Sequence, residues 1–157
     1  MLFRSSPTTT SSGLFPEQAC FLNSVRVFFD TNVLVSAFLA RGLCADLLRL
    51  VLSEHTLVCS EVVLAELRDV LSRKGRLPLE QIEAIEAFLR DQPVAPRPAT
   101  TLQLGLVDAD DEWVVASAVL AQADLFVTGD QGVLACTAPP LPVCTPRGCW
   151  EQLRCSG

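Results

Sequence analysis

Carboxylates that follow apolar runs are the residues of this 157-residue chain whose types and positions could do chemistry. Asp30 comes directly after VRVFF, and Asp130 comes two residues after the run DLFVT. A third acidic group stands where a helical pattern begins: Asp108, Asp110 and Asp111. In open α/β sheets the functional crevice lies beyond the carboxyl ends of the strands, so we expect these carboxylates at one rim. Their mutual repulsion would raise their pKa values unless cations bind between them.

Glu66 is the remaining acidic candidate, and it lies in a segment with helical periodicity. A helix is expected over 61–74, with Ser60 as its N-cap and with Val63 and Leu67 on its apolar face. Glu66 stands three residues after Val63, which predicts that it points inward. A carboxylate there must be paired, protonated or bound to a metal, because an isolated buried charge is very costly.

Oxygen-only ligands suit Mg²⁺ or Mn²⁺ better than zinc. A carboxylate cluster can hold one or two such ions, which activate a water molecule and neutralise charge on a phosphoryl group. Phosphodiester hydrolysis is therefore the expected chemistry. Two structural interpretations stay open, since the acids near Asp108 could serve only as helix caps and Glu66 could pair with an arginine.

Short apolar strands that alternate with helices must position these groups. Strands are expected at 25–29, 56–59, 124–128 and 142–144, and helices at 31–40, 44–54, 61–74, 78–91, 108–123, around Val133 and at 146–154. Pro93, Pro96 and Pro98 indicate a connecting segment. This alternation predicts an α/β fold whose parallel sheet is covered by helices on both faces.

Composition restricts the class of protein. Half of the residues are apolar, 19% are charged and the formal net charge is −6. These values favour one packed domain, expected at 25–157, and argue against a nucleic-acid binder that relies on bulk positive charge. Residues 1–24 contain SSPTTTSSG and indicate a disordered extension. No apolar run approaches the roughly 20 residues of a membrane span, so we expect a soluble, cytoplasmic protein without a membrane partner.

The seven cysteines are expected to be reduced thiols, because their number is odd and several lie in apolar runs. The four late ones contain no C-x-x-C pair and have no histidine nearby, which disfavours a zinc site. The single histidine, His55, is expected at the surface in a turn before the second strand.

Four blocks of the sequence resemble the successive signature blocks of the PIN-domain ribonucleases, especially the toxin components of bacterial toxin–antitoxin pairs. They are VFFDTNVLVSAFL, SEVVLAEL, DADDEWVVASAVLAQADLFVTGD and CTPRGCWEQL, and the similarity runs from about residue 25 to residue 153. The resemblance implies a small twisted parallel sheet in a three-layer arrangement. It also implies an acidic pocket that binds Mg²⁺ or Mn²⁺ and cuts single-stranded RNA.

The resemblance assigns the four acidic positions of that family to Asp30, Glu66, Asp111 and Asp130. By hypothesis Asp30 and Asp130 contact metal directly, and Asp111 does so directly or through water. Glu66 is a further candidate ligand and orients the attacking water. Asp108 is the alternative to Asp111 as a ligand.

Two neutral residues are expected to support the acidic positions. By the resemblance, Asn32 steadies the first aspartate, and Thr128 adds a hydroxyl to the same network by its position.

A local basic patch at the end of the Glu66 helix is a candidate surface for RNA. It consists of Arg68, Arg73, Lys74 and Arg76. Arginine suits phosphate through bidentate hydrogen bonds, although a solvated helix end that complements the helix dipole explains the same pattern equally well. Aromatic residues for base stacking are scarce, and both tryptophans are compatible with a core position.

The toxin interpretation implies two protein partners. One is a small antitoxin that covers the acidic pocket and presents an arginine to it, and the other is a second copy of the chain. The main alternative is a PIN-like module that binds RNA or protein without turnover. A phosphatase with a nucleophilic aspartate is disfavoured, because Asn32 stands where its second aspartate would be.

Overall fold

The computed structural model describes residues 24–154, and its elements follow the order expected from the sequence. They are β1 (Arg26–Phe29), α2 (Thr31–Leu39), α3 (Leu43–Glu54), β2 (Thr56–Ser60), α4 (Glu61–Arg73), α5 (Leu79–Arg90), β3 (Val94–Ala95), α6 (Ala109–Leu120), β4 (Leu125–Val127), α7 (Gln131–Leu134), β5 (Val143–Cys144) and α8 (Pro146–Arg154). The expected extension at 1–24 lies outside the described residues apart from Ser24. Its separation from a domain at 25–157 stays a prediction.

The five strands form one parallel sheet in the order β3-β2-β1-β4-β5. β1 is central, with Val27 opposite Leu57 of β2 on one side and opposite Leu125 of β4 on the other. The chain builds β2 and β3 outward from β1, and then returns to build β4 and β5 on the other side. The strand order therefore reverses between β1 and β4, and crevices of open α/β sheets form at such switch points.

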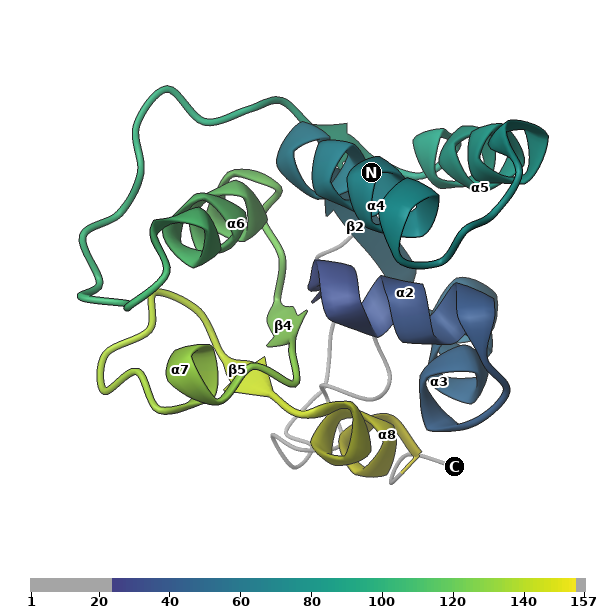
Figure 1. Cartoon of the computed structure of the whole chain (residues 1–157). Coiled ribbons are helices and arrows are strands. Elements are labelled where there is room, and N and C mark those ends of the chain that lie inside the picture. The colour runs from purple at the N-terminus through teal and green to yellow at the C-terminus, as the bar shows by residue number, and fades with distance from the viewer. Residues whose placement is uncertain (1–23, 155–157) are drawn as a thin grey trace.

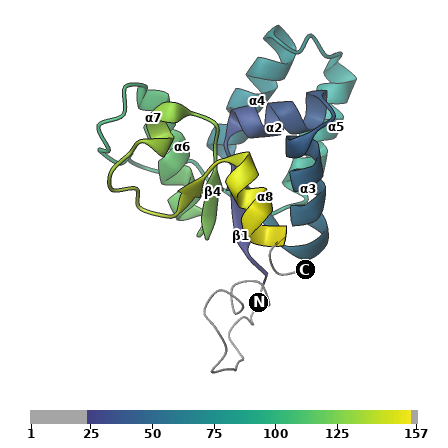
Figure 2. The same cartoon turned by 90° about the horizontal axis from the view of Figure 1, so that it is seen from below.

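Helices cover both faces of the sheet, which confirms the expected α/β class (Figure 1). Figure 2 shows α6 and α7 on one side of β1 and β4, and α2 and α3 on the opposite side. Because both faces are covered, β1 needs apolar side chains in both directions. Val27, Phe28 and Phe29 are accordingly all buried.

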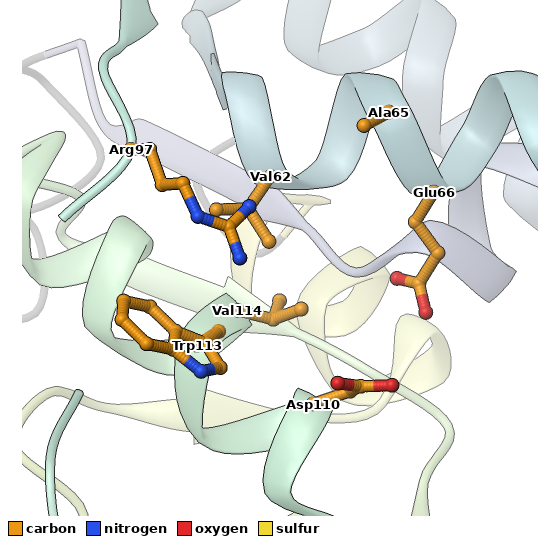
Figure 3. Close-up of a pocket in the computed structure, with 7 residues that line it drawn as sticks. All are labelled: Val62, Ala65, Glu66, Arg97, Asp110, Trp113 and Val114. Atoms are coloured by element: carbon orange, nitrogen blue, oxygen red, sulfur yellow. The ribbon is translucent and has the colours of Figure 1, made fainter. Parts of the chain in front are cut away.

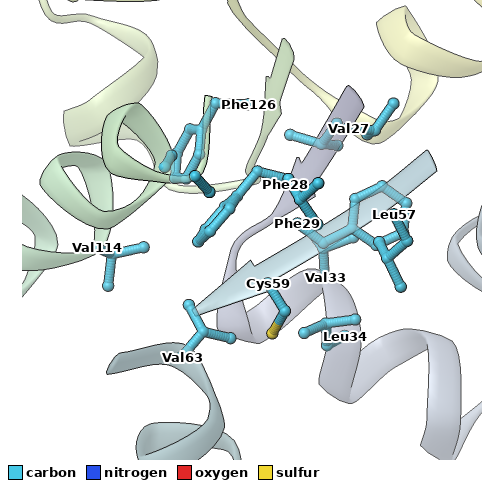
Figure 4. Close-up of a cluster of buried hydrophobic side chains, with 14 of the residues drawn as sticks. Val27, Phe28, Phe29, Val33, Leu34, Leu57, Cys59, Val63, Val114 and Phe126 are labelled. Carbon is cyan, nitrogen blue, oxygen red and sulfur yellow. The ribbon is translucent and has the colours of Figure 1, made fainter. Parts of the chain in front are cut away.

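The core lies between the sheet and these helix layers (Figure 4). Phe28 of β1 stacks on Phe126 of β4 with ring centroids 5.6 Å apart. Val63 of α4 and Val114 of α6 are buried in the same cluster. The two strands that carry Asp30 and Asp130 at their carboxyl ends are thus held together by aromatic packing.

The segment around Pro93 differs from the expectation, because it contains a strand. Val94 and Ala95 form β3, which pairs with Cys59 and Ser60 at the edge of the sheet. The Cys59 N–H also donates to the Pro93 carbonyl at 2.9 Å. Two residues between prolines carry no alternating pattern, and their pairing is with residues distant in sequence, so no local signal predicted this strand.

His55 also differs from the expectation of a surface residue. Its ring is half-buried at the end of α3, where Nδ1 accepts a hydrogen bond from the Val25 N–H at 3.1 Å. Nε2 is buried and has no hydrogen-bond partner in residues 24–154. Burial lowers the pKa of His55, against a smaller opposite effect of Glu54.

The cysteines within the described residues agree with the reduced state expected from the sequence. They are free thiols: Cys44, Cys59, Cys136, Cys144 and Cys149. None of the helices of this part of the chain has both the length and the apolar character needed to cross a membrane.

Candidate active site

Asp30 is held rigidly at the carboxyl end of β1. Its backbone N–H donates to Val127 O of β4 at 2.9 Å, which continues the ladder between the two strands. Oδ1 accepts from the Thr31 N–H at 2.7 Å, and Oδ2 accepts from the Thr128 hydroxyl at 2.6 Å. The residue is only 5% exposed. Burial raises the pKa of Asp30, while these two hydrogen bonds act in the opposite direction.

Thr128 connects Asp30 to Asp130. Its buried hydroxyl donates to Asp30 and accepts from the Asp130 N–H at 3.0 Å. Asp130 Oδ1 in turn caps α7 by accepting from the Gly132 N–H at 2.7 Å and the Val133 N–H at 3.3 Å. A Cβ at position 132 would lie 3.1 Å from that oxygen, so glycine permits the close approach. The hydroxyl expected from the position of Thr128 therefore lies within the acidic network.

The acids at the start of α6 divide into different structural roles. Asp108 is the N-cap, and its side chain accepts from the Asp110 N–H at 2.9 Å. Asp111, in the first turn, is half-buried near the other carboxylates. Burial first, and then repulsion from Asp130, Asp108 and Asp30, raises the pKa of Asp111 to about 7. The structure thus favours capping for Asp108 and a place in the acidic cluster for Asp111.

Glu66 lies across from Asp30 on α4 and is half-buried, as its position on the helix predicted. The Thr31 hydroxyl donates to Glu66 Oε1 at 2.5 Å, which orients the carboxylate. Repulsion from Glu66 is one of the smaller causes that raise the pKa of Asp30, so the two carboxylates interact electrostatically. Glu66 forms no salt bridge to any arginine of residues 24–154, so the arginine pairing left open by the sequence is not present there.

Asn32 does not make the contact expected of it. Its side chain is exposed at the start of α2 and has no hydrogen bond to Asp30. Thr31 and Thr128 hold that carboxylate instead.

The basic patch at the end of α4 is partly neutralised by neighbouring carboxylates. Arg68 forms an ion pair with Glu86 of α5 at 2.6 Å, and Arg73 forms one with Asp69. Lys74 and Arg76 form no ion pair within the part of the chain that the structure describes. Any attraction of this patch for RNA is therefore weaker than its four positive charges suggest.

A family model described as PIN domain matches residues 26–132. The chain belongs to the PIN domain family. The matched range contains Asp30, Glu66, Asp111 and Asp130, so every acidic position of the candidate site lies inside the PIN domain.

Two solved structures share the fold of this PIN domain. A chain of VapBC2 from Rickettsia felis, bound to a DNA fragment from its promoter, matches it with a TM-score of 0.59 and 19% identity, over 76% of this chain and 98% of that one. A chain of FitAB, bound to the IR36 DNA fragment, matches with a TM-score of 0.55 and 20% identity, over 76% and 94%. At such identities the likeness establishes the fold. No curated protein matches the chain.

The acidic cluster of this PIN domain fits a divalent cation by its chemistry. The groups near one another are carboxylates with threonine hydroxyls, which is the oxygen-only set that Mg²⁺ and Mn²⁺ prefer. Burial first, and the neighbouring carboxylates after it, raise the pKa of Asp111, and a cation bound at the cluster would favour its charged form. Among residues 24–154, however, no group of three or more Asp, Glu, His or Cys side chains is arranged so that it could hold a metal ion.

A pocket of about 270 Å³ adjoins the acidic cluster of the PIN domain (Figure 3). Its lining comes from α4, α6 and the segment after β3, and comprises Val62, Ala65, Glu66, Arg97, Asp110, Trp113 and Val114. Arg97 and Trp113 were not singled out as site residues from the sequence, and Trp113 was considered compatible with the core. Arg97 follows the unpredicted strand β3, so its position depends on pairing that the local sequence does not reveal.

Proposed function

We propose that this PIN domain is an endoribonuclease that hydrolyses phosphodiester bonds of single-stranded RNA with the help of Mg²⁺ or Mn²⁺. The observation that carries the proposal is the carboxylate cluster at the switch point of the sheet. There Asp111 acquires a pKa of about 7 through burial and the proximity of Asp130, Asp108 and Asp30. Such a cluster is costly unless a cation compensates it, and the cation then attracts a phosphate.

Asp30, Asp111 and Asp130 are the residues that would hold the metal. A bound divalent cation would supply an activated water and neutralise charge on the phosphoryl group. The chain's own contribution is to fix the ligands, since Thr31 and Thr128 leave Asp30 little freedom to turn. One or two ions are compatible with this set of ligands, and Asp108 is the alternative ligand to Asp111.

Glu66 is suited to orient the attacking water. Its Oε1 accepts from the Thr31 hydroxyl, and no hydrogen bond to Oε2 is made by residues 24–154, so Oε2 is free to accept a hydrogen bond from water. Glu66 is half-buried on the first half of α4, and its charge is near enough to Asp30 to raise the pKa of that carboxyl.

We further propose that the protein is the toxin of a toxin–antitoxin pair, with a small antitoxin as its partner. The similarity of four sequence blocks to toxin components supports this assignment, and so does the fold shared with chains of VapBC2 and FitAB. An arginine of the antitoxin, placed among the carboxylates, would compensate the charge that a metal compensates in the active enzyme. Self-association is proposed on the resemblance alone.

The decisive experiment measures cutting of end-labelled single-stranded RNA by the purified protein in Mg²⁺, in Mn²⁺ and in EDTA. The most informative variant is Asp111→Asn. It removes a proposed ligand, and it also removes the repulsion between Asp111 and the neighbouring carboxylates, so it should not destabilise the fold. We expect cutting that depends on metal, and at least about a hundred-fold slower cutting by Asp111→Asn with an undiminished melting temperature.

Asp91→Asn is the matched control, since Asp91 is exposed at the end of α5. It should cut RNA as fast as the wild type. If varied RNAs are left intact in every condition, and neither metal raises the melting temperature of the wild type, the enzyme assignment fails and a binding module without turnover replaces it.

A further inference from the structure

The pocket beside the acidic cluster has two chemically different ends. Figure 3 shows Glu66 and Asp110 at one end and Arg97 and Trp113 at the other. The apolar side chains of Val62 and Val114 lie between them. A ligand that fills this pocket must therefore offer a flat or apolar part to the middle and negative charge or hydrogen-bond acceptors to Arg97.

Arg97 differs from the arginines nearby because it has no carboxylate partner. Arg68, Arg73 and Arg90 are all committed to acids on α4 or α5. Within residues 24–154, Arg97 forms no ion pair, and its guanidinium carbon lies 5.0 Å from the centre of the Trp113 ring. Its hydrogen-bond donors thus remain available to a ligand.

The position of Arg97 is built into the sheet. It comes two residues after Ala95, which pairs with Ser60 at the carboxyl end of β2. Parallel strands bring their carboxyl ends to one rim, so β3 delivers Arg97 to the same rim as Asp30 and Asp130. Trp113 lies two residues beyond Asp111 on α6 and is half-buried.

A nucleotide meets the requirements of both ends of the pocket. Proteins recognise unpaired bases by stacking them on aromatic rings or on guanidinium planes, and arginine binds phosphate bidentately. The chain carries a net charge of −6, so attraction for RNA must come from local and unpaired positive charge. Arg97 supplies such a charge at the end of the pocket opposite Glu66 and Asp110.

We propose that this pocket holds one unpaired nucleotide of the RNA next to the scissile phosphate, with its base against the Arg97–Trp113 pair. The proposal rests on the proposed function, because it extends the same site. It makes Arg97 and Trp113 residues that bind substrate and fix which phosphate reaches the carboxylates.

Binding of a fluorescently labelled single-stranded RNA tests the role of Arg97 without relying on cutting. Anisotropy is compared for the wild type, Arg97→Ala and Arg154→Ala. Arg154 is a matched control because its guanidinium lies 4.9 Å from the centre of the other tryptophan ring, Trp150, on α8. Arg97→Ala should weaken binding about ten-fold, the order found for one stacked base, while Arg154→Ala should change it less than two-fold.

Tryptophan fluorescence tests the stacking itself. In a Trp150→Phe background Trp113 is the only tryptophan, and stopped-flow mixing records its quenching before any RNA is cut. We expect quenching by intact RNA. We also expect little quenching by RNA that has one abasic residue at the nucleotide next to the scissile phosphate. Binding of that RNA should not be weakened by Arg97→Ala.

The outcomes separate this inference from the proposed function. If metal-dependent cutting occurs but Arg97→Ala and the abasic RNA behave as the wild type and the intact RNA do, the pocket is not a nucleotide site and the nuclease stands. If quenching depends on Arg97 while no RNA is ever cut, the pocket stands and the nuclease fails. If Arg97→Ala and Arg154→Ala weaken RNA binding equally, the loss of one positive charge explains the effect wherever that charge lies. That result would overturn the inference.

Discussion

A single hydroxyl organises the acidic cluster at the scale of residues. Thr128 donates to Asp30 Oδ2 and accepts from the Asp130 N–H, so it uses its proton on one candidate ligand and a lone pair on the backbone of another. Thr128 itself is fully buried. The geometry of Asp30 relative to Asp130 therefore depends on Thr128.

Replacing Thr128 by valine should destabilise the protein by about 1–3 kcal/mol, because the buried Asp30 carboxylate and the part-buried Asp130 N–H each lose a partner. The same change should raise the pKa of Asp30 further, since the hydrogen bond from Thr128 lowers it. Urea denaturation near neutral pH measures the free energy of unfolding.

Thr128→Ser keeps the hydroxyl and removes only the methyl group. It should be the milder substitution of the two. If Thr128→Val leaves the free energy of unfolding unchanged while Thr128→Ser lowers it, packing of the methyl group stabilises the protein and the hydrogen bonds do not.

At the scale of elements, α6 presents Asp111 and Trp113 only because the long segment before it is tied down. Glu112, between those two residues, accepts from the Leu104 N–H at 2.9 Å and from the Leu106 N–H at 3.2 Å through one carboxylate oxygen. Gly105 between these two amides has a φ of +74°, which a residue with a side chain rarely adopts. The turn and the carboxylate together fold the segment back onto the helix.

We expect Glu112→Ala to release this segment while the sheet stays intact. Hydrogen–deuterium exchange at the Leu104 and Leu106 amides should then accelerate by about ten-fold or more, because both lose their acceptor. Amides of β1 and β4 should exchange as slowly as before.

Glu83→Ala provides the comparison, since Glu83 is an exposed glutamate on α5. It should leave exchange at both loop amides unchanged. Slow exchange of Leu104 and Leu106 in Glu112→Ala would mean that other contacts hold the segment.

At the scale of the whole molecule, the pH dependence of folding should carry a contribution from His55. The folded protein favours the neutral imidazole, because the ring is partly buried and Nδ1 accepts from the Val25 N–H. Its pKa is lowered, so the unfolded chain binds a proton more readily below its ordinary value of about 6.5. The stability contributed by neutral His55 is complete above that pH and is lost as the pH falls.

Between pH 7.5 and pH 5 the wild type should lose more stability than His55→Asn, whose amide oxygen can accept the same hydrogen bond and does not titrate. Urea midpoints at both pH values measure the difference, and other titrating groups cancel in the comparison. As the only histidine, His55 also gives an unambiguous NMR titration. A folded pKa at or above 6.5 would contradict the expectation.

The sequence by itself determined every element except β3 and grouped most of the carboxylates of the acidic cluster. Apolar runs and caps are local signals, so β1, β4 and the helix that starts after Ser60 could be placed without a structure. Parallel strands meet at one rim for geometric reasons, and this was enough to group Asp30 with Asp130. Helical periodicity was enough to place Glu66 half-buried.

Only the tertiary structure decided which groups touch. The spacing of Asp108, Asp110 and Asp111 could not distinguish the cap from the clustered carboxylate, because that depends on how α6 lies against β4. The pairing of Arg68 with Glu86 and the edge strand before Arg97 are contacts between residues distant in sequence, and the exposure of Asn32 depends on what packs around α2. Local patterns record the conformation of a segment, whereas side-chain partners across the sheet are set by packing, and that is why the pocket at Arg97 and Trp113 emerged only from the fold.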